Sequence, residues 1–347
     1  MDVLGLDVGG ANIKAAGLRL GENREIKTSI EYFPVWKMGK ENLSLAIQKT
    51  VKKLGWKNFD WVGLTMTAEL SDVYFDKVEG VNHVLDCVCK IFPVEQIFVL
   101  DVDGNLLTVN KARKKPYKVA SANWMATGWL VSKHLKNCLV VDVGSTTTSI
   151  IPILNGKVAA TGKTDLEKLL NGELVYTGVL RTNVATIVDK VPVKNGYAKV
   201  SSEVFALTGD VHLILGNIKG KDYTTETADG RGKTRLEAMA RIARIVCADL
   251  NMLTQKEIKK ICEYIYNKQL EQIIQGIKKV LSRVEVKKRK NLPVVVTGLG
   301  GKFLAGKAVK KVGLKNIFEL EKIVGLKVSV CTPAYGLALM VAEKIGF

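Results

Sequence analysis

The sequence predicts an α/β protein made of two similar halves. Strand-like and helix-like segments alternate through the first 135 residues, and the pattern restarts with an apolar strand at residues 138–143. The two beginnings also match, since residues 6–10 read LDVGG and residues 141–145 read VDVGS. Asp7 and Asp142 are 135 residues apart, so the sequence indicates duplication of a whole domain, not a short repeat.

The first half follows an order of three strands, a helix, a strand, a helix, a strand and a final helix. Asp103-Gly104, after the last of these strands, is a dipeptide typical of a hairpin turn. We expect these elements at residues 2–8, 13–20, 25–33, 40–55, 61–66, 78–91, 96–100 and 120–135.

The second half begins with three more strands and continues with long helices. Asn155-Gly156 predicts a tight turn between the second and third strands. Residues 162–230 look irregular apart from a short helix, and residues 254–257 (TQKE) fit a capping box at the start of a long helix. The expected elements are strands at 138–143, 147–154, 157–161 and 292–297, and helices near 202–215, from about 231 to 250, from 254 to about 280, and from about Pro333 onward.

Composition restricts the class of protein and partner. The net charge of +18 favours anionic partners, and without a recognised nucleic-acid motif we expect small anionic molecules and not nucleic acid. The basic run at 287–290 is interpreted as a solvated loop. No segment approaches the roughly 20 apolar residues of a membrane span, and the chain starts with a strand pattern, so we expect a cytoplasmic protein with no signal peptide. The six cysteines lack a CxxC pair, which predicts buried reduced thiols without zinc, and a homo-oligomer is left open.

Glycine turns follow an aspartate in both halves. A tight glycine turn can direct backbone N–H groups at an anion, while an aspartate at the end of a buried strand needs a cation or a metal ion. A purely structural hairpin is the alternative for the first turn, and a third glycine turn at 298–301 precedes a helix. The candidate metal ligands are Asp7 and Asp142, and the candidate phosphate-binding residues are Gly9, Gly10, Asn12, Lys14, Gly144, Ser145, Thr146, Thr147, Gly298, Gly300 and Gly301.

This order of turns resembles the superfamily of actin, sugar kinases and heat-shock ATPases. The resemblance covers nearly the whole chain, with the two hairpins matching the phosphate loops and residues 294–301 matching the adenosine loop. It implies duplicated ribonuclease-H-like lobes with a cleft between them. The implied lobes are residues 1–135 with 331–347, and residues 136–330 with a helical insertion.

More specific segments resemble an archaeal and methylotroph family that is related to hydantoinase A and linked to tetrahydromethanopterin and methanofuran metabolism. They are residues 4–16, 65–72, 119–126, 142–153, 172–183 and 227–231. The resemblance implies a transferase that joins (5-(aminomethyl)furan-3-yl)methyl diphosphate to the phenol of γ-glutamyltyramine and releases diphosphate. An ATP-dependent kinase or ATPase of the same fold is the alternative, and a non-catalytic nucleotide sensor is a third reading.

Two departures bear on this choice. Gly10 stands where sugar kinases usually carry Ser or Thr, which disfavours phosphoryl transfer from ATP. Ser149 stands where relatives often carry an acid, so one metal ligand is absent. We expect Mg²⁺ held by Asp7 and Asp142, and leave ATP binding open.

The remaining candidates are assigned from the chemistry of this reaction. Glu69 and Asp72 follow a predicted strand, so either could deprotonate the phenol or pair with an ammonium group, or simply cap the next segment. We favour Glu69 as the base because it comes first after the strand. The candidate substrate-binding residues are Asn123 and Trp124 for stacking, Arg181 and Asn183 for a carboxylate, and Asp229 and Arg231 for an anion; core packing, a surface loop and helix capping are the respective alternatives.

Overall fold

The computed structural model describes residues 1–22, 24–285, 291–325, 328 and 330–347. The chain forms two compact units. The first unit comprises Met1–Cys138, Ile151–Leu170 and Leu320–Phe347, and the second comprises Leu139–Ile150 and Asn171–Glu319. The basic run at 287–290 lies outside the described residues.

The first unit contains a sheet with the strand order β3-β2-β1-β4-β5-β6. The first three strands pair antiparallel, and β1, β4 and β5 pair parallel. The expected Asp103-Gly104 turn is confirmed, because it lies in the antiparallel β5–β6 hairpin and Gly104 has a φ of +85°. The strands are β1 (Asp2–Val8), β2 (Asn12–Arg19), β3 (Glu25–Tyr32), β4 (Trp61–Met66), β5 (Ile97–Leu100) and β6 (Leu106–Thr108).

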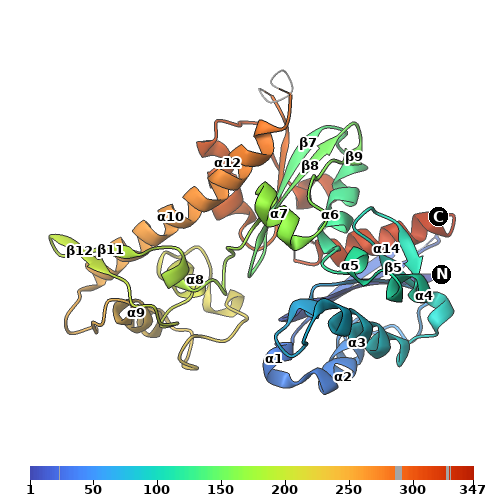
Figure 1. Cartoon of the computed structure of the whole chain (residues 1–347), viewed down its shortest axis with the longest axis horizontal. Helices are drawn as coiled ribbons and strands as arrows, with labels where there is room; N and C mark the ends of the chain where they lie inside the picture. The colour runs from blue at the N-terminus through green and yellow to red at the C-terminus, as the bar shows by residue number, and fades with distance from the viewer. Residues whose placement is uncertain (23, 286–290, 326–327, 329) are drawn as a thin grey trace. The chain divides into compact units, whose positions relative to one another are not determined.

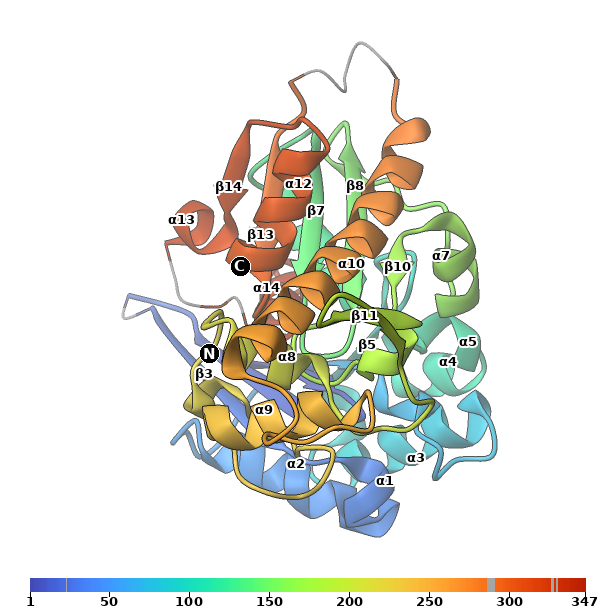
Figure 2. The ribbon, with the colours of Figure 1, turned by 90° about the vertical axis from the view of Figure 1, so that its left-hand side faces the viewer.

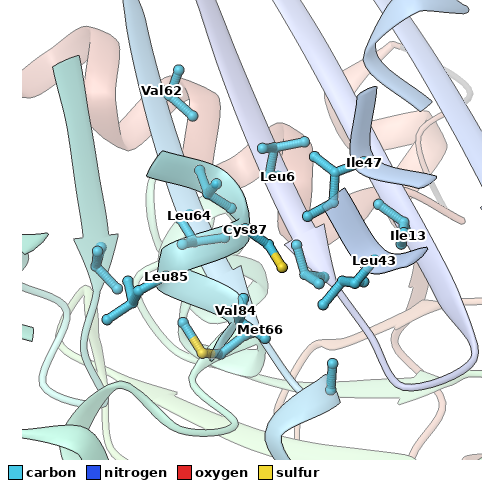
Figure 3. Close-up of a cluster of buried hydrophobic side chains, with 14 of the residues drawn as sticks. Leu6, Ile13, Leu43, Ile47, Val62, Leu64, Met66, Val84, Leu85 and Cys87 are labelled. Atoms are coloured by element: carbon cyan, nitrogen blue, oxygen red, sulfur yellow. The ribbon is translucent and has the colours of Figure 1, made fainter. Parts of the chain in front are cut away.

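One face of this sheet carries the larger apolar core. Successive strand residues point to opposite faces, so Leu6 and its register partner Leu64 share this face. Figure 3 shows them with side chains of α2 (Leu43–Lys52) and α3 (Lys77–Cys89), among them Ile47 and Val84. The Asp76 side chain caps α3 by accepting a hydrogen bond from the Glu79 amide at 2.8 Å.

The opposite face packs against α14 (Thr332–Lys344) at very short range. A Cβ on Gly5 would lie 1.9 Å from the Ala334 carbonyl oxygen, and one on Gly63 would lie 2.7 Å from Leu337. Helix α14, red in Figure 1, also packs against α6 (Asn123–Ser132). Asp7 lies two residues beyond Gly5 and Thr65 two beyond Gly63, so both occupy this same face at the carboxyl ends of their strands.

The other helices of the first unit are short. The helix expected at 120–135 is confined to Asn123–Ser132, because a short helix and a strained turn precede it. These helices are α1 (Val35–Met38), α4 (Val109–Arg113), α5 (Pro116–Val119), α7 (Asp165–Asn171, of which the last residue belongs to the second unit) and α13 (Leu320–Val324).

The second sheet repeats the order of the first. Its order is β10-β8-β7-β13-β14, with antiparallel pairing of β10 to β8 and parallel pairing from β7 through β13 to β14. The third expected strand, at 157–161, is shortened to residues 157–158 (β9), which pair with one end of β8, and the unexpected strand β10 pairs with the other end. The predicted duplication is therefore confirmed. The strands are β7 (Cys138–Val143), β8 (Thr148–Leu154), β9 (Lys157–Val158), β10 (Leu174–Val175), β13 (Val294–Thr297) and β14 (Ile317–Glu319).

A helical insertion accompanies the second sheet. Figure 2 shows the long helix α10 (Gln255–Ser282) beside α12 (Gly306–Lys311), and its predicted capping box is confirmed by a Thr254 side chain that accepts from the Glu257 amide. The region expected to be irregular contains the β11–β12 hairpin, which sequence patterns missed. The added elements are β11 (Lys190–Val193), β12 (Gly196–Lys199), α8 (Thr208–Ile214) and α9 (Arg235–Arg244).

Three further expectations concern the lobe boundaries, membrane spans and the cysteines. Ile151–Leu170 belongs to the first compact unit, whereas the repeat places these residues in the second lobe, so the lobe boundaries stay a prediction. Among the residues described, no helix is long and apolar enough to cross a membrane. Of the cysteines expected to be buried, Cys247 is exposed and Cys89 is only partly buried.

Candidate functional site

Asp7 occupies the carboxyl end of β1, between two polar neighbours. In the strand register it lies opposite Lys14 on β2 and beside Thr65 on β4. The Lys14 Nζ is 3.6 Å from Asp7 Oδ2, and only 2% of Asp7 is exposed. Burial raises the pKa of the Asp7 carboxyl, while the Lys14 ammonium and the Asn123 side chain act in the opposite direction. Burial thus disfavours the charged form of this carboxyl, and positive charge beside it favours that form.

Several buried polar atoms of the first unit, including one of Asp7, lack a hydrogen-bond partner among the described residues. Buried polar groups are normally hydrogen-bonded, so such a group of atoms is typical of a place where a ligand or water binds. They come from β1, β4, the 3₁₀ turn η2 (Ala68–Leu70) that follows β4, and α6. In these four elements the unpartnered atoms of the described residues are Asp7 Oδ1, Thr65 Oγ1, Glu69 Oε2, Trp124 Nε1 and Thr127 Oγ1.

The glycine turns are shaped by close backbone contacts. A Cβ on Gly9 would lie 2.7 Å from the Asn12 carbonyl oxygen, and one on Gly10 would lie 2.9 Å from Ser71 Oγ. The sequence predicted amides that point at an anion, but four of these amides already donate to backbone carbonyls. Gly9, Gly144, Gly300 and Gly301 donate to the carbonyls of Asn12, Thr147, Val143 and Gly298, at 2.9 to 3.0 Å. An anion at these turns would therefore need other donors.

Glu69 is the most unusual carboxyl of the first unit. It is 1% exposed, its Oε1 lies at hydrogen-bond distance, 2.6 Å, from Ser121 Oγ, and its Oε2 is buried without a partner in the described residues. Burial raises the pKa of Glu69 to about 7, although Ser121 and Lys77 lower it and Asp165 adds a small increase. A carboxyl with this pKa can exchange a proton near neutral pH.

Ser121 and Asp165 complete a chain of contacts that sequence reasoning missed. Ser121 Oγ also lies 2.6 Å from Asp165 Oδ2, and Asp165 is ion-paired with Lys77 at 3.1 Å. Ser121 has a φ of +52°, which is costly for a residue other than glycine. The expected segment 119–126 included Ser121, and its position just before α6 was the available signal.

The other first-unit candidates have distinct environments. Asp72 is exposed, unlike Glu69, so it does not share the buried position. Asn123 contributes to the surroundings of Asp7. Trp124 is 3% exposed, and the Lys168 Nζ lies 4.0 Å from its ring centroid. Core packing, the alternative left open for Trp124, describes its position, and one face of the ring is covered by an ammonium group.

The second unit brings three predicted segments together. The Val179 amide donates to Gly144 O and the Leu180 amide to Ser145 O, so the segment at 178–182 covers the second hairpin turn. Its Arg181 donates to Thr146 Oγ1 at 3.2 Å. Gly178 is required there, since a Cβ would lie 2.6 Å from the Ser145 and Thr146 backbone.

The third glycine turn contacts the same hairpin. Gly298 has a φ of +80°, and a Cβ there would lie 2.4 Å from Asp142 Oδ1. A π-helix, Gly301–Ala305, follows the turn, and such irregular helices are frequent at functional sites. Asp142, Arg181 and the turn at 298–301 therefore form one polar region of the second unit.

The remaining candidates have structural roles. The Asn183 side chain caps a 3₁₀ turn by accepting from the Ala185 amide. Asp229 accepts from Arg241 and Arg244 at 3.1 and 3.2 Å, and Arg231 is exposed. Neither residue caps the following helix, because Thr234 is its N-cap. In the described residues, no group of three or more His, Cys, Asp or Glu side chains could hold a metal ion.

Comparison with known proteins gives matches over most or all of the chain. The family model for hydantoinase/oxoprolinase matches residues 60–344. A protein of Methanocaldococcus jannaschii named (4-{4-[2-(gamma-L-glutamylamino)ethyl]phenoxymethyl}furan-2-yl)methanamine synthase is 38% identical, with 99% of this chain and 98% of the relative covered. A Methanococcus vannielii protein of the same name is 38% identical over 62% of this chain and 96% of its own length.

A solved structure supports the fold. The nucleotide-free structure of an acetone carboxylase matches with a TM-score of 0.60 and 11% sequence identity. The match covers 97% of this chain and 70% of that one. Together with the repeated strand order, this likeness supports the predicted duplicated α/β fold.

Proposed function

The chain belongs to the hydantoinase/oxoprolinase family, and from this premise we propose that it is a transferase that forms an aryl ether in methanofuran biosynthesis. Its relatives are named for a product in which a phenol oxygen is joined to a furan through a methylene group. The proposed substrates are γ-glutamyltyramine and (5-(aminomethyl)furan-3-yl)methyl diphosphate. The phenol oxygen forms a bond to the methylene carbon, and diphosphate leaves with the electron pair of the broken C–O bond.

The buried Glu69 carboxyl supports this chemistry most directly. A phenol has a pKa of about 10, so it needs a base to become a good nucleophile near neutral pH. Glu69 Oε2 is buried and unpartnered in the described chain, and burial raises the pKa of this carboxyl to about 7. A base of that strength suits the removal of the phenol proton. Asp72, exposed three residues later, is better suited to the substrate's ammonium group.

Polar residues at the ends of the strands are proposed to balance the negative charge of the leaving group. The departing diphosphate is an anion, and Lys14 supplies an ammonium group beside Asp7. Burial around Glu69 also favours the reaction, because water would compete with the phenol for the electron-deficient methylene carbon. Arg181, beside the second hairpin, is proposed to bind the glutamyl carboxylate.

A magnesium ion fits the environment of Asp7. Mg²⁺ is commonly held by one or two carboxylates together with waters and substrate phosphate oxygens. Asp7 Oδ1 is a buried oxygen without a hydrogen-bond partner in the described residues, and Asp7 lacks enough positive charge to lower its pKa. Bound there, the ion would neutralise negative charge on diphosphate. Asp142 belongs to the second unit, so its share in the same ion stays a proposal.

The test is an incubation of the purified protein with both substrates, with and without Mg²⁺ and with and without ATP. We expect mass spectrometry to detect the ether product, together with one diphosphate per product, without any need for ATP. Formation of ADP that depends on either substrate would instead identify a kinase or ATPase. Absence of ether product under every condition, with folded protein, would contradict the proposed function.

A further inference from the structure

One hydroxyl lies between two carboxyl groups in the first unit. Ser121 Oγ is 2.6 Å from both Glu69 Oε1 and Asp165 Oδ2. A serine hydroxyl has a single proton and can donate one hydrogen bond, while its oxygen can accept others. Two contacts of this length therefore require one of the carboxyls to be protonated and to donate to Ser121 Oγ.

The surroundings decide which carboxyl holds that proton. Asp165 is 21% exposed at its side chain and lies 3.1 Å from the Lys77 ammonium, which stabilises a negative charge. Glu69 is buried, and burial disfavours its charged form. The other titratable groups around the 3₁₀ turn, Tyr74 and His83, are hydrogen-bonded to each other at 2.8 Å. The resting arrangement is therefore Glu69 Oε1–H donating to Ser121, and Ser121 donating to ionised Asp165.

From this geometry we propose that Ser121 and Asp165 form a proton relay that carries the phenol proton from Glu69 to solvent. The inference rests on the proposed function. Three protons move together: the phenol proton to Glu69 Oε2, the Glu69 Oε1 proton to Ser121 Oγ, and the Ser121 proton to Asp165 Oδ2. The phenol becomes a phenolate as Asp165 becomes neutral, so charge is conserved. Asp165, which is partly exposed, then releases its proton to water.

The backbone at Ser121 is consistent with such a role. A φ of +52° is uncommon for serine, and strained residues are concentrated at functional sites. In this conformation the Ser121 hydroxyl lies between Glu69, 52 residues earlier in the chain, and Asp165, 44 residues later. Glu69 touches the substrate in this scheme, while Ser121 and Asp165 act through it.

The discriminating variant is Asp165→Asn, read by the pH dependence of kcat. In the wild type, the relay needs only one of the two carboxyls to be ionised, so activity persists below the pKa of Glu69 itself. In Asp165→Asn, Glu69 must ionise on its own, and we expect the acidic limb to move to higher pH by about one unit, with roughly 10-fold lower kcat at pH 6.

A purely structural Asp165 predicts the opposite direction. The negative charge of Asp165 raises the pKa of Glu69, so its removal would move the acidic limb to lower pH. A shift to lower pH, or no shift, overturns the relay. Asp103→Asn is the matched control, because Asp103 is also partly exposed and ion-paired with Lys118 and Lys163 at 2.8 and 3.1 Å. It should leave the profile unchanged.

Ser121→Gly tests the hydroxyl without adding backbone strain, because glycine accepts a positive φ. We expect a folded protein with a kcat lowered by about 10- to 100-fold. Ser132→Ala, which removes a hydroxyl that donates to the Trp129 carbonyl, is the control and should retain full activity. A fully active Ser121→Gly overturns the relay.

An infrared measurement decides the proton arrangement without using activity. At pH 6 the wild type should show a protonated-carboxyl band that disappears in Glu69→Gln. The titration midpoint of this band should change in Ser121→Gly, because the hydroxyl 2.6 Å from Glu69 Oε1 is removed. Absence of any such band overturns the relay. If the wild type makes no ether, the proposed function fails, while the band still reports on the carboxyl pair.

Discussion

Glu69 and Asp72 are three residues apart and both carry a carboxyl group, but only the carboxyl of Glu69 is buried. Glu69 is 1% exposed and its pKa is raised to about 7, whereas Asp72 is exposed. The preference for Glu69 as the base came from its place directly after a strand. That reasoning placed Glu69 near the strand end but did not identify the hydroxyl and the second carboxyl beside it.

Replacement of Glu69 by Gln should lower the rate of ether formation by about 10²- to 10⁴-fold, the usual range for general-base assistance. The loss should shrink when the phenol carries fluorine, because a more acidic phenol needs less help. The measurement is single-turnover formation of the ether with tyramine and fluorotyramine substrates. A normal rate for Glu69→Gln with the unsubstituted phenol, or no relief by fluorine, would exclude Glu69 as the base.

The same substitution should change how stability depends on pH. The folded protein binds the Glu69 proton more tightly than the unfolded chain, whose ordinary pKa is 4.5. The resulting stabilisation is present below pH 4.5 and is lost as pH rises through about 7. Relative to wild type, Glu69→Gln should therefore gain up to about 3 kcal/mol in unfolding free energy between pH 4 and pH 8. Urea unfolding at both values measures this, and an unchanged difference contradicts the raised pKa.

Asp7 and Asp2 lie at opposite ends of β1, so replacing each by asparagine gives a matched comparison. Asp7→Asn should lower Mg²⁺-dependent turnover by about 10²-fold, because it removes charge from a buried oxygen that fits the ion. Asp2→Asn, at the other end of β1 where Asp2 pairs with Arg19, should retain turnover. Initial rates over a Mg²⁺ titration provide the test. Equal turnover for Asp7→Asn and wild type would remove Asp7 from the metal site.

At the scale of elements, two strand ends and two helices position the site. Asp7 and Thr65 lie on the face of the sheet against α14, while Glu69 follows β4 in a 3₁₀ turn. Helix α3 supports this turn at very short range. A Cβ on Gly80 of α3 would lie 2.5 Å from the Glu69 carbonyl oxygen and 2.6 Å from its Cα. These are backbone atoms, which cannot move away from an added Cβ as the end of a flexible side chain could.

Gly80→Ala should therefore destabilise the protein by about 1–3 kcal/mol and displace Glu69, although alanine favours helices over glycine. Gly196→Ala is the control, because nothing lies within 4 Å of its added Cβ and it should change stability by less than about 0.5 kcal/mol. Urea unfolding and ether formation are measured together. A Gly80→Ala variant as stable and active as wild type would show that α3 does not fix the position of Glu69.

At the scale of the whole molecule, the excess of basic residues should act on an anionic substrate. The net charge of +18 creates a field that attracts a diphosphate ester and is screened by salt. Increasing ionic strength from about 0.02 to 0.2 M should lower kcat/KM for the diphosphate substrate by roughly 10-fold, with little change in kcat. The KM for zwitterionic γ-glutamyltyramine is the internal control. Salt-independent kcat/KM would show that long-range attraction plays no part.

The sequence by itself determined what depends on neighbouring residues. Alternating apolar residues and glycine turns predicted both sheets, the turns at Gly104 and Gly156, and the capping box at Thr254. The repeated aspartate at strand ends predicted the duplication. The same local patterns placed Glu69 beside a strand end. They failed for the β11–β12 hairpin and for β10, whose short strands give weak periodic signals.

Only the tertiary structure decided the chemistry of the carboxyls. Ser121 contacts Glu69, which is 52 residues away in the sequence, and Asp165, which is 44 residues away. No local sequence pattern could therefore predict these two contacts. The raised pKa of Glu69 comes mainly from burial, which depends on how distant elements pack around it. Four of the glycine amides expected to bind an anion likewise donate to backbone carbonyls, one of them to a carbonyl more than 150 residues earlier in the chain. Burial and hydrogen bonding between distant segments arise only when the chain has folded, and together they set the proton affinity of Glu69.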